Sequence, residues 1–225
     1  IGGHDKLFAP QSKEDSDIFN RFILNGYKVV QTRKGCVYHM TCRGSRFADG
    51  AKRNPSGEVF MKNRETDEWL AQNERSTRNF IRKWGTMVQH DRLLKPIISP
   101  MYSIGFELVD STNIESIRLL EPWCCYMVVP DRELIQQYIE EEQPNTDYDL
   151  SKKLHTDIPN NPIYDIKLVF DANDITQRSF NIIQKLPDII KDSGSEGERF
   201  ELDIFDIWIE QMVEKQRNNI VCNSN

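Results

Sequence analysis

Three carboxylates within four positions, Glu14, Asp15 and Asp17, are the side chains of this chain best placed to do chemistry. They begin an apolar pattern, at positions 18, 19, 22 and 23, that has helical spacing, and Gly26 is a natural stop for such a helix. Ser12 and Asp15 have the spacing of a capping box. Because the first turn of a helix favours negative charge, the pattern predicts fixed, ionised carboxylates. A carboxylate held in this way can act as a general base, although acidic first turns are also common without any function.

The surrounding segments supply a context for the carboxylates. Gly-Gly-x-Asp-x-x-Phe starts at Gly2 and precedes Glu-Asp-x-Asp, and the apolar helix then ends in Asn-Gly-Tyr. Val37-Tyr38-His39 ends a strand-like run, and a Phe-x-x-Lys-Trp-Gly segment closes at Gly85. This ordered set resembles the acceptor-side half of family-2-like GT-A glycosyltransferases. The resemblance covers roughly residues 1–98, and the ordered set is more specific than any of its pieces.

The resemblance implies roles for individual residues. It implies that Asp15 is the catalytic base and that Glu14 orients the acceptor or supports the site. It implies that Gly2, Gly3 and Asp5 shape the acceptor loop. Asp17 is a further substrate-side candidate, with Arg21 at helical spacing as its structural alternative. The resemblance also implies that His39 is a metal ligand, and a structural histidine is its alternative. Arg43, Ser45 and Arg46 follow His39 and could donate to diphosphate oxygens, with ion pairs of the arginines to Glu14 or Asp17 as the structural alternative.

Glycosyl transfer also needs positive charge on the departing nucleoside diphosphate. A divalent metal, Mn or Mg rather than Zn, is therefore the expected cofactor. A nucleotide-sugar donor and a glycan, lipid or protein acceptor are the expected partners. The nucleotide-binding strands of a GT-A domain and their Asp-x-Asp motif would precede Ile1. We therefore expect the chain to be a C-terminal part of a longer, inverting enzyme, and to be inactive alone.

Composition separates the chain into two parts. Residues 1–98 carry a net charge of +7 and residues 99–225 a net charge of −13. The sign changes near a proline-flanked segment at positions 95–100, which predicts a GT-A part over 1–98 and a separate acidic module over 99–225. The acidic module argues against nucleic-acid binding. Five cysteines without Cys-x-x-Cys spacing favour free thiols and a cytoplasmic location, and no apolar run is long enough to span a membrane.

The expected fold class is α/β to α+β. Strand-like runs are predicted over 27–31 and 35–40, a polar loop over 48–66 and a linker over 93–100. A helix is predicted over 67–84, and most residues of its basic stripe, Arg75, Arg78, Arg82 and Lys83, are expected to be solvated. Strands and helices then alternate from residue 102 to residue 208, with a single strand over 200–208. This order allows a small ferredoxin-like α+β module or an extension of the first domain, and the ferredoxin-like sandwich is the favoured interpretation. The alternatives to an enzyme are a non-catalytic binding module and a viral structural or assembly module. The oligomeric state has no signature in the sequence.

Overall fold

A computed structural model describes residues 1–10, 12–30, 32–35, 52–53, 59–60, 67–111, 113–158 and 164–215. In this part of the chain the helices are α1 (Glu14–Leu24), α2 (Asp67–Trp84), α3 (Ile114–Leu120), α4 (Arg132–Glu142) and α5 (Gln177–Ser193). The strands are β1 (Lys52–Arg53), β2 (Val59–Phe60), β3 (Gln89–His90), β4 (Pro96–Ile97), β5 (Ile104–Leu108), β6 (Tyr126–Val128), β7 (Leu154–His155), β8 (Ile166–Phe170), β9 (Glu198–Leu202) and β10 (Phe205–Ile209). No helix among the described residues is long and apolar enough to cross a membrane.

A six-stranded mixed sheet with the order β7-β6-β5-β8-β10-β9 forms the centre of the molecule. The strands β5, β6, β7 and β8 run parallel, and β10 pairs antiparallel with both β8 and β9. The α/β expectation is therefore confirmed at the level of fold class. The ferredoxin-like interpretation was wrong, because α3 and α4 each connect two strands that lie side by side and pair in parallel, whereas the split βαβ units of a ferredoxin-like fold place another strand between them.

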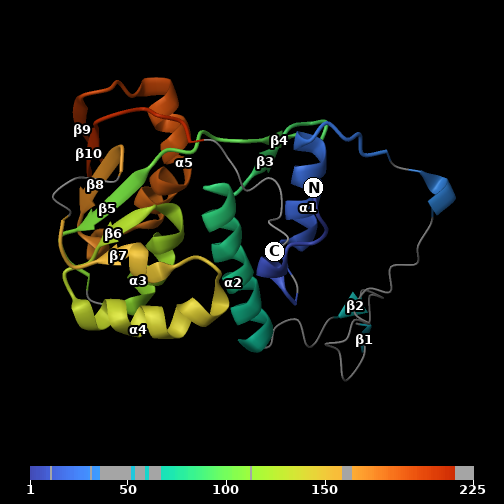
Figure 1. The fold of residues 1–225 in the computed structure, drawn as a ribbon, viewed down its shortest axis with the longest axis horizontal. Coiled ribbons are helices and arrows are strands. Elements are labelled where there is room, and N and C mark those ends of the chain that lie inside the picture. Colours follow the sequence, from blue (N-terminus) through green and yellow to red (C-terminus); the bar gives the residue numbers. More distant parts are fainter. Residues whose placement is uncertain are drawn as a thin grey trace.

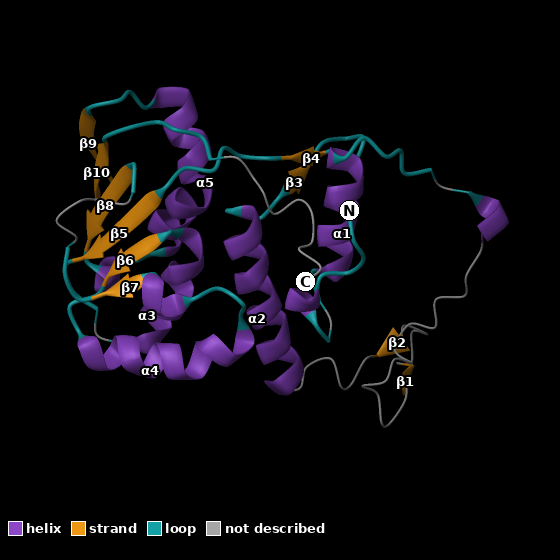
Figure 2. Cartoon of the chain, in the orientation of Figure 1, coloured by secondary structure: helices purple, strands orange, loops and turns teal. Residues whose placement is uncertain are grey.

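One row of side chains across the sheet shows why this arrangement is stable. Met127, Phe106, Leu168 and Ile207 are register partners on four adjacent strands, and all four are fully buried. The apolar stripes of α3 and α5 belong to the same core, together with Ile81 of α2. Figure 2 shows these helices gathered on one side of the sheet. The core thus lies between one sheet face and a layer of helices, as in other layered domains.

Helix α2 lies between the sheet and α1 (Figure 1). Its apolar residues divide accordingly, since Ile81 joins the large core while Phe80 and Trp84 form a smaller core with Phe8. The predicted division near residue 98 assigns α2 to the first part alone, whereas its side chains contact both parts. Independent folding of residues 99–225 stays a prediction.

Several local expectations can be compared with the structure. The predicted helices are all present, and α5 continues through Pro187. The run predicted as one strand over 200–208 is instead the hairpin β9–β10, which turns at Asp203 in the left-handed region. The expected linker over 93–100 and the expected loop over 48–66 contain short strands, β4 and the pair β1–β2. Residues 27–30 do not form the strand predicted there.

Helix α1 ends as the sequence predicts. Gly26 has a φ of 82°, its N–H donates to Ile23, and the N–H of Tyr27 donates to the Phe22 carbonyl. This pair of bonds is a Schellman motif, and the Phe22 and Tyr27 rings pack edge to face beside it. Contacts between neighbouring residues therefore fix the C-terminal end of α1.

Candidate functional site

The first turn of α1 presents Glu14 and Asp15 at the edge of the N-terminal loop. The helix cap is Lys13 in the left-handed region, and it makes no side-chain cap hydrogen bond. The capping box expected from Ser12 is therefore absent, because Ser12 also has a positive φ and lies before the cap. Asp15 is exposed to solvent. Oε2 of Glu14 is buried and has no hydrogen-bond partner among the described residues.

Asp17 lies one turn further and is fully buried. Its Oδ2 accepts from Nε of Arg21 at 2.8 Å, as the helical spacing predicted. The Arg21 guanidinium in turn donates to the carbonyl of Gly3 at 2.6 Å and to that of Ile1. Asp17 therefore fixes the loop containing Gly2 and Gly3 through Arg21. In this structure Asp17 contacts Arg21, and the substrate contact expected from the sequence stays a prediction.

Helix α2 completes the cluster from the other side. Nζ of Lys83 lies 2.6 Å from Oδ2 of Asp5 and 2.8 Å from Oδ1 of Asp17. Nε1 of Trp84 donates to the same Oδ1 at 3.0 Å. Burial opposes ionisation of Asp5, but hydrogen bonds from Lys83 and from the Leu7 amide outweigh it and lower the pKa of Asp5 below its ordinary value. Residues from positions 5, 17, 83 and 84 thus form one buried charge network, which we call the Asp5–Asp17 cluster.

Trp84→Phe is expected to lower the free energy of unfolding by at least about 1.5–3 kcal/mol, because it removes a buried hydrogen bond to a charged acceptor and replaces the indole with a smaller aromatic ring. Urea unfolding measures this difference. Trp69→Phe, at the half-buried start of α2, is the control for losing an indole. An unchanged stability in Trp84→Phe would show that neither the bond to Asp17 nor the packing of the indole contributes net stability.

Four residues of the predicted site lie outside the described residues. They are His39, Arg43, Ser45 and Arg46. Within the described part of the chain, no group of three His, Cys, Asp or Glu side chains could hold a metal ion. The predicted metal ligand and diphosphate contacts therefore stay predictions.

A second buried charge network, which the sequence did not indicate, links α2 to the sheet. The Arg82 guanidinium contacts Glu121 at 2.5 Å and Glu142 at 2.9 Å. Lys153 reaches the other oxygen of Glu121 at 2.5 Å, and the Tyr138 hydroxyl donates to Glu121 at 3.0 Å. Arg78 adds two hydrogen bonds to Glu142, at 2.7 and 2.8 Å. We call this set the Arg82–Glu121 network. The basic residues of α2 were expected to face solvent. Arg78 and Arg82 are instead paired with carboxylates that lie about 40–60 positions away in the sequence.

The Arg82–Glu121 network predicts an acid-sensitive fold. Burial opposes ionisation of Glu121, but Lys153 and Arg82 outweigh it and lower its pKa from 4.5 to about 2. A depressed carboxyl pKa stabilises the fold above the unfolded value and loses that contribution as the pH falls from about 4.5 toward 2. The shift corresponds to roughly 3 kcal/mol. Urea unfolding at pH 5.5 and pH 3 should therefore depend less on pH in Glu121→Gln than in the unmodified chain. An equal pH dependence in both would contradict the assignment.

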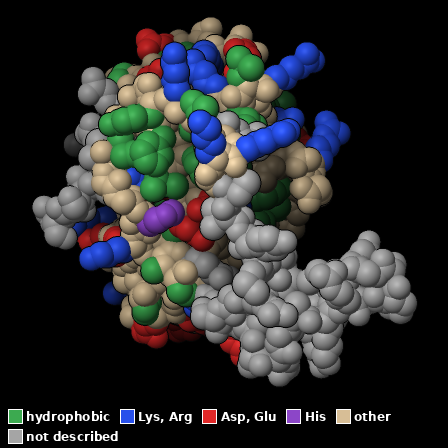
Figure 3. Space-filling view, turned by 90° about the vertical axis from the view of Figure 1, so that its right-hand side faces the viewer, with side chains coloured by type: hydrophobic (Ala, Val, Ile, Leu, Met, Phe, Trp, Pro, Cys, Tyr) green, Lys and Arg blue, Asp and Glu red, His purple; other side chains and the backbone are tan. Residues whose placement is uncertain are grey.

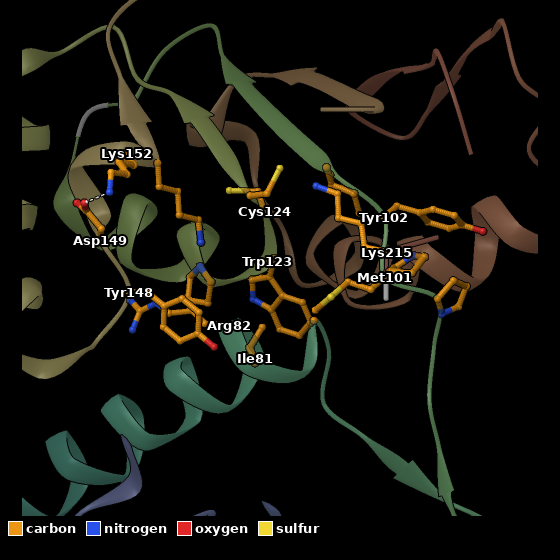
Figure 4. A pocket seen from close by; sticks show the side chains of 17 residues that line it. Ile81, Arg82, Met101, Tyr102, Trp123, Cys124, Tyr148, Asp149, Lys152 and Lys215 are labelled. Atoms are coloured by element: carbon orange, nitrogen blue, oxygen red, sulfur yellow. Dashed lines mark ion pairs between the residues drawn. The ribbon is translucent and has the colours of Figure 1, made fainter. Parts of the chain in front are cut away.

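A cavity of about 300 Å³ lies where α2 approaches the N-terminal ends of the sheet strands. Figure 4 shows Trp123 in its middle, with Tyr148 and Arg82 on one side and Met101 and Lys215 on the other. Burial, followed by the nearby Asp5 charge, raises the pKa of Tyr148 to about 12, so its hydroxyl is neutral and can donate a hydrogen bond at pH 7. The cavity combines apolar walls with cationic and neutral donors. It is separate from the first turn of α1, since neither Glu14 nor Asp15 lines it.

Comparison with known proteins adds no assignment. The chain matches no protein-family model, no curated protein and no solved structure.

Proposed function

We propose that this chain is the acceptor-side part of a metal-dependent, inverting GT-A glycosyltransferase, with Asp15 as the general base. One observation carries the proposal. The pieces of sequence that suggested this family lie up to about 80 positions apart, and Asp5, Asp17, Lys83 and Trp84 from three of them meet in the Asp5–Asp17 cluster. An incidental match of short motifs gives no reason for such a meeting.

The chemistry follows from what this cluster supports. The buried Asp17 fixes the first turn of α1 through its contacts with Arg21 and Lys83, while Asp15 is open to solvent. A carboxylate in that position can accept the proton of an acceptor hydroxyl as the hydroxyl attacks the anomeric carbon. Glu14 is the neighbouring group that orients the hydroxyl, because its buried Oε2 still needs a donor among the described residues.

The donor side of the reaction rests on residues outside the described part of the chain. The proposal assigns His39 to Mn or Mg and assigns Arg43, Ser45 and Arg46 to the diphosphate. Bound metal would offset charge on the departing nucleoside diphosphate. No described group of side chains fits a metal, so the steps above rest on Glu14 and Asp15 alone.

Exposed apolar side chains on α1, in the segment that follows it and in the turn between β3 and β4 support the idea that further protein packs on this side of the molecule. Phe19 is 50% exposed, Val30 77% and Leu93 88%. Figure 3 shows hydrophobic side chains gathered on the side of the molecule that carries α1, with Lys and Arg around them. Contiguous exposed apolar groups commonly mark interaction surfaces. In the proposal this surface contacts the nucleotide-binding half of the domain. The free thiols of Cys124 and Cys125 support its further assignment to the cytoplasm.

The proposal is tested on the full-length protein with a panel of nucleotide sugars, with Mn and with a chelator. We expect sugar transfer or donor hydrolysis that requires the metal. His39→Ala should weaken metal-dependent donor binding, while His155→Ala, a half-buried histidine of β7, should not. Absence of turnover with every donor would overturn the enzyme assignment, and binding without turnover would favour a non-catalytic binding module.

A further inference from the structure

The Arg82–Glu121 network holds an excess of positive charge beside the cavity shown in Figure 4. Its three cations are Arg78, Arg82 and Lys153, and its two carboxylates are Glu121 and Glu142, which leaves one net positive charge. Side-chain exposure is 1% for Arg82 and 13% for Lys153, so water screens this charge poorly. Arg82 and Lys153 line the cavity, whereas the two carboxylates do not. The cavity therefore faces the cationic side of the network.

A further cation reaches the cavity from the C-terminal end of the described chain. The backbone N–H of Lys215 donates to the Met101 carbonyl at 2.8 Å, which ties this residue to the segment leading into β5. Its Nζ donates to the Ser103 hydroxyl at 2.6 Å, which is a neutral group. Lys152 also lines the cavity, but Asp149 neutralises it at 3.0 Å. The network and Lys215 thus bring positive charge to the cavity, while Glu214 and Asp188 bring negative charge near Tyr102 in the same wall.

The rest of the wall is apolar and partly aromatic. Trp123 is 9% exposed and lies in the middle of the lining, with Ile81 and Met101 nearby (Figure 4). Pro122 and Pro187 close other parts of the wall. A cavity of about 300 Å³ is at the small end of pockets that bind organic molecules, which span roughly 300–1,000 Å³. A flat apolar group can pack on Trp123 while an anionic group reaches the cations.

We propose that this cavity binds a small organic anion, with its phosphate or carboxylate between Lys215 and Arg82 and its apolar or aromatic body against Trp123. Entry of the anion offsets the excess buried charge, and burial of the flat group supplies the hydrophobic contribution. This assignment does not depend on the proposed glycosyl transfer, because it uses neither the first turn of α1 nor the Asp5–Asp17 cluster.

Four probes separate the contributions, with binding measured by calorimetry and by quenching of tryptophan fluorescence. Phenyl phosphate and phenylacetate carry both an anion and a ring. Inorganic phosphate lacks the ring, and benzyl alcohol lacks the charge. We expect at least one aromatic anion to bind about tenfold or more tightly than either incomplete probe. The better of the two anions identifies phosphate or carboxylate as the preferred group.

Two variants place the probe in the cavity. Lys215→Ala should weaken the anion about tenfold and leave benzyl alcohol unchanged, while Lys191→Ala, an exposed lysine on α5 outside the lining, should change neither. Cys125→Trp should fill the cavity and abolish binding of all probes, with a thermal melt to verify its fold. The proposal would be overturned if benzyl alcohol or inorganic phosphate bound as tightly as the aromatic anions. It would also be overturned if Lys215→Ala bound the anions unchanged, or if no probe showed saturable binding up to roughly 10 mM. None of these measurements involves a sugar donor, so each proposal can fail without the other.

Discussion

Asp15→Asn is expected to lower the rate of glycosyl transfer by about 100- to 10,000-fold, which is the usual cost of losing a general base. Asparagine keeps the size of the side chain but cannot take up the acceptor proton. The fold should change little, since Asp15 is exposed and its contribution at the helix start is only about 0.3–1 kcal/mol. Initial rates with saturating donor and acceptor, together with a thermal melt, measure both effects.

The matched control for this variant is Asp67→Asn. Asp67 is also an exposed carboxylate in the first turn of a helix, α2, but the proposal gives it no role in the reaction. Its substitution should leave the rate within about twofold, less than 1 kcal/mol in the activation free energy. Near-normal turnover by Asp15→Asn, or an equal loss in the Asp67 variant, would remove Asp15 from the mechanism.

Arg82→Met is expected to lower the free energy of unfolding by about 3–5 kcal/mol. Methionine keeps part of the aliphatic volume, but Glu121 and Glu142 lose a partner that each contacts in a buried position. Breaking these pairs is costly because each carboxylate stays buried with only one cation left, Lys153 for Glu121 and Arg78 for Glu142. Such a loss would be a large part of the roughly 5–15 kcal/mol that stabilises a typical domain. Urea unfolding at pH 7 measures it.

Arg118→Met serves as the comparison, because Arg118 bridges Glu115 and Glu141 on a more exposed part of α3 and α4. Its loss should cost less than about 1 kcal/mol. The double variant Arg82→Met with Glu121→Gln should recover part of the stability lost in Arg82→Met, since the two substitutions together remove one buried charge of each sign. A loss below about 1 kcal/mol in Arg82→Met would show that the network does not hold α2 against the sheet.

The sequence alone determined the local elements. Apolar periodicity predicted all five described α-helices, because the apolar residues of a buried helix face repeat within a few turns. Gly26 marked the end of α1 for the same reason, because a C-terminal stop depends only on neighbouring residues. The motifs around Asp5, Asp15 and Trp84 could likewise be found, because each lies within one short segment.

Strand pairing was decided by the tertiary structure. The alternation that predicts β8 is the same for parallel and antiparallel neighbours, so it could not exclude a ferredoxin-like order. The turn at Asp203 also went unpredicted, because alternation continues on both sides of it and only the pairing of β9 with β10 reveals a hairpin.

The charged clusters show the same limit. A basic residue on an amphipathic helix is usually solvated, and nothing near Arg82 in the sequence indicates that Glu121 will cover it. Lys83 likewise joins Asp5 and Asp17 only after the chain has folded back over more than 60 positions. Which side chains could ionise was therefore a property of the sequence. The tertiary structure decided which charges are buried together, which charge is in excess beside the cavity, and which carboxylate stays open to solvent. These properties depend on contacts between segments that are distant in the sequence.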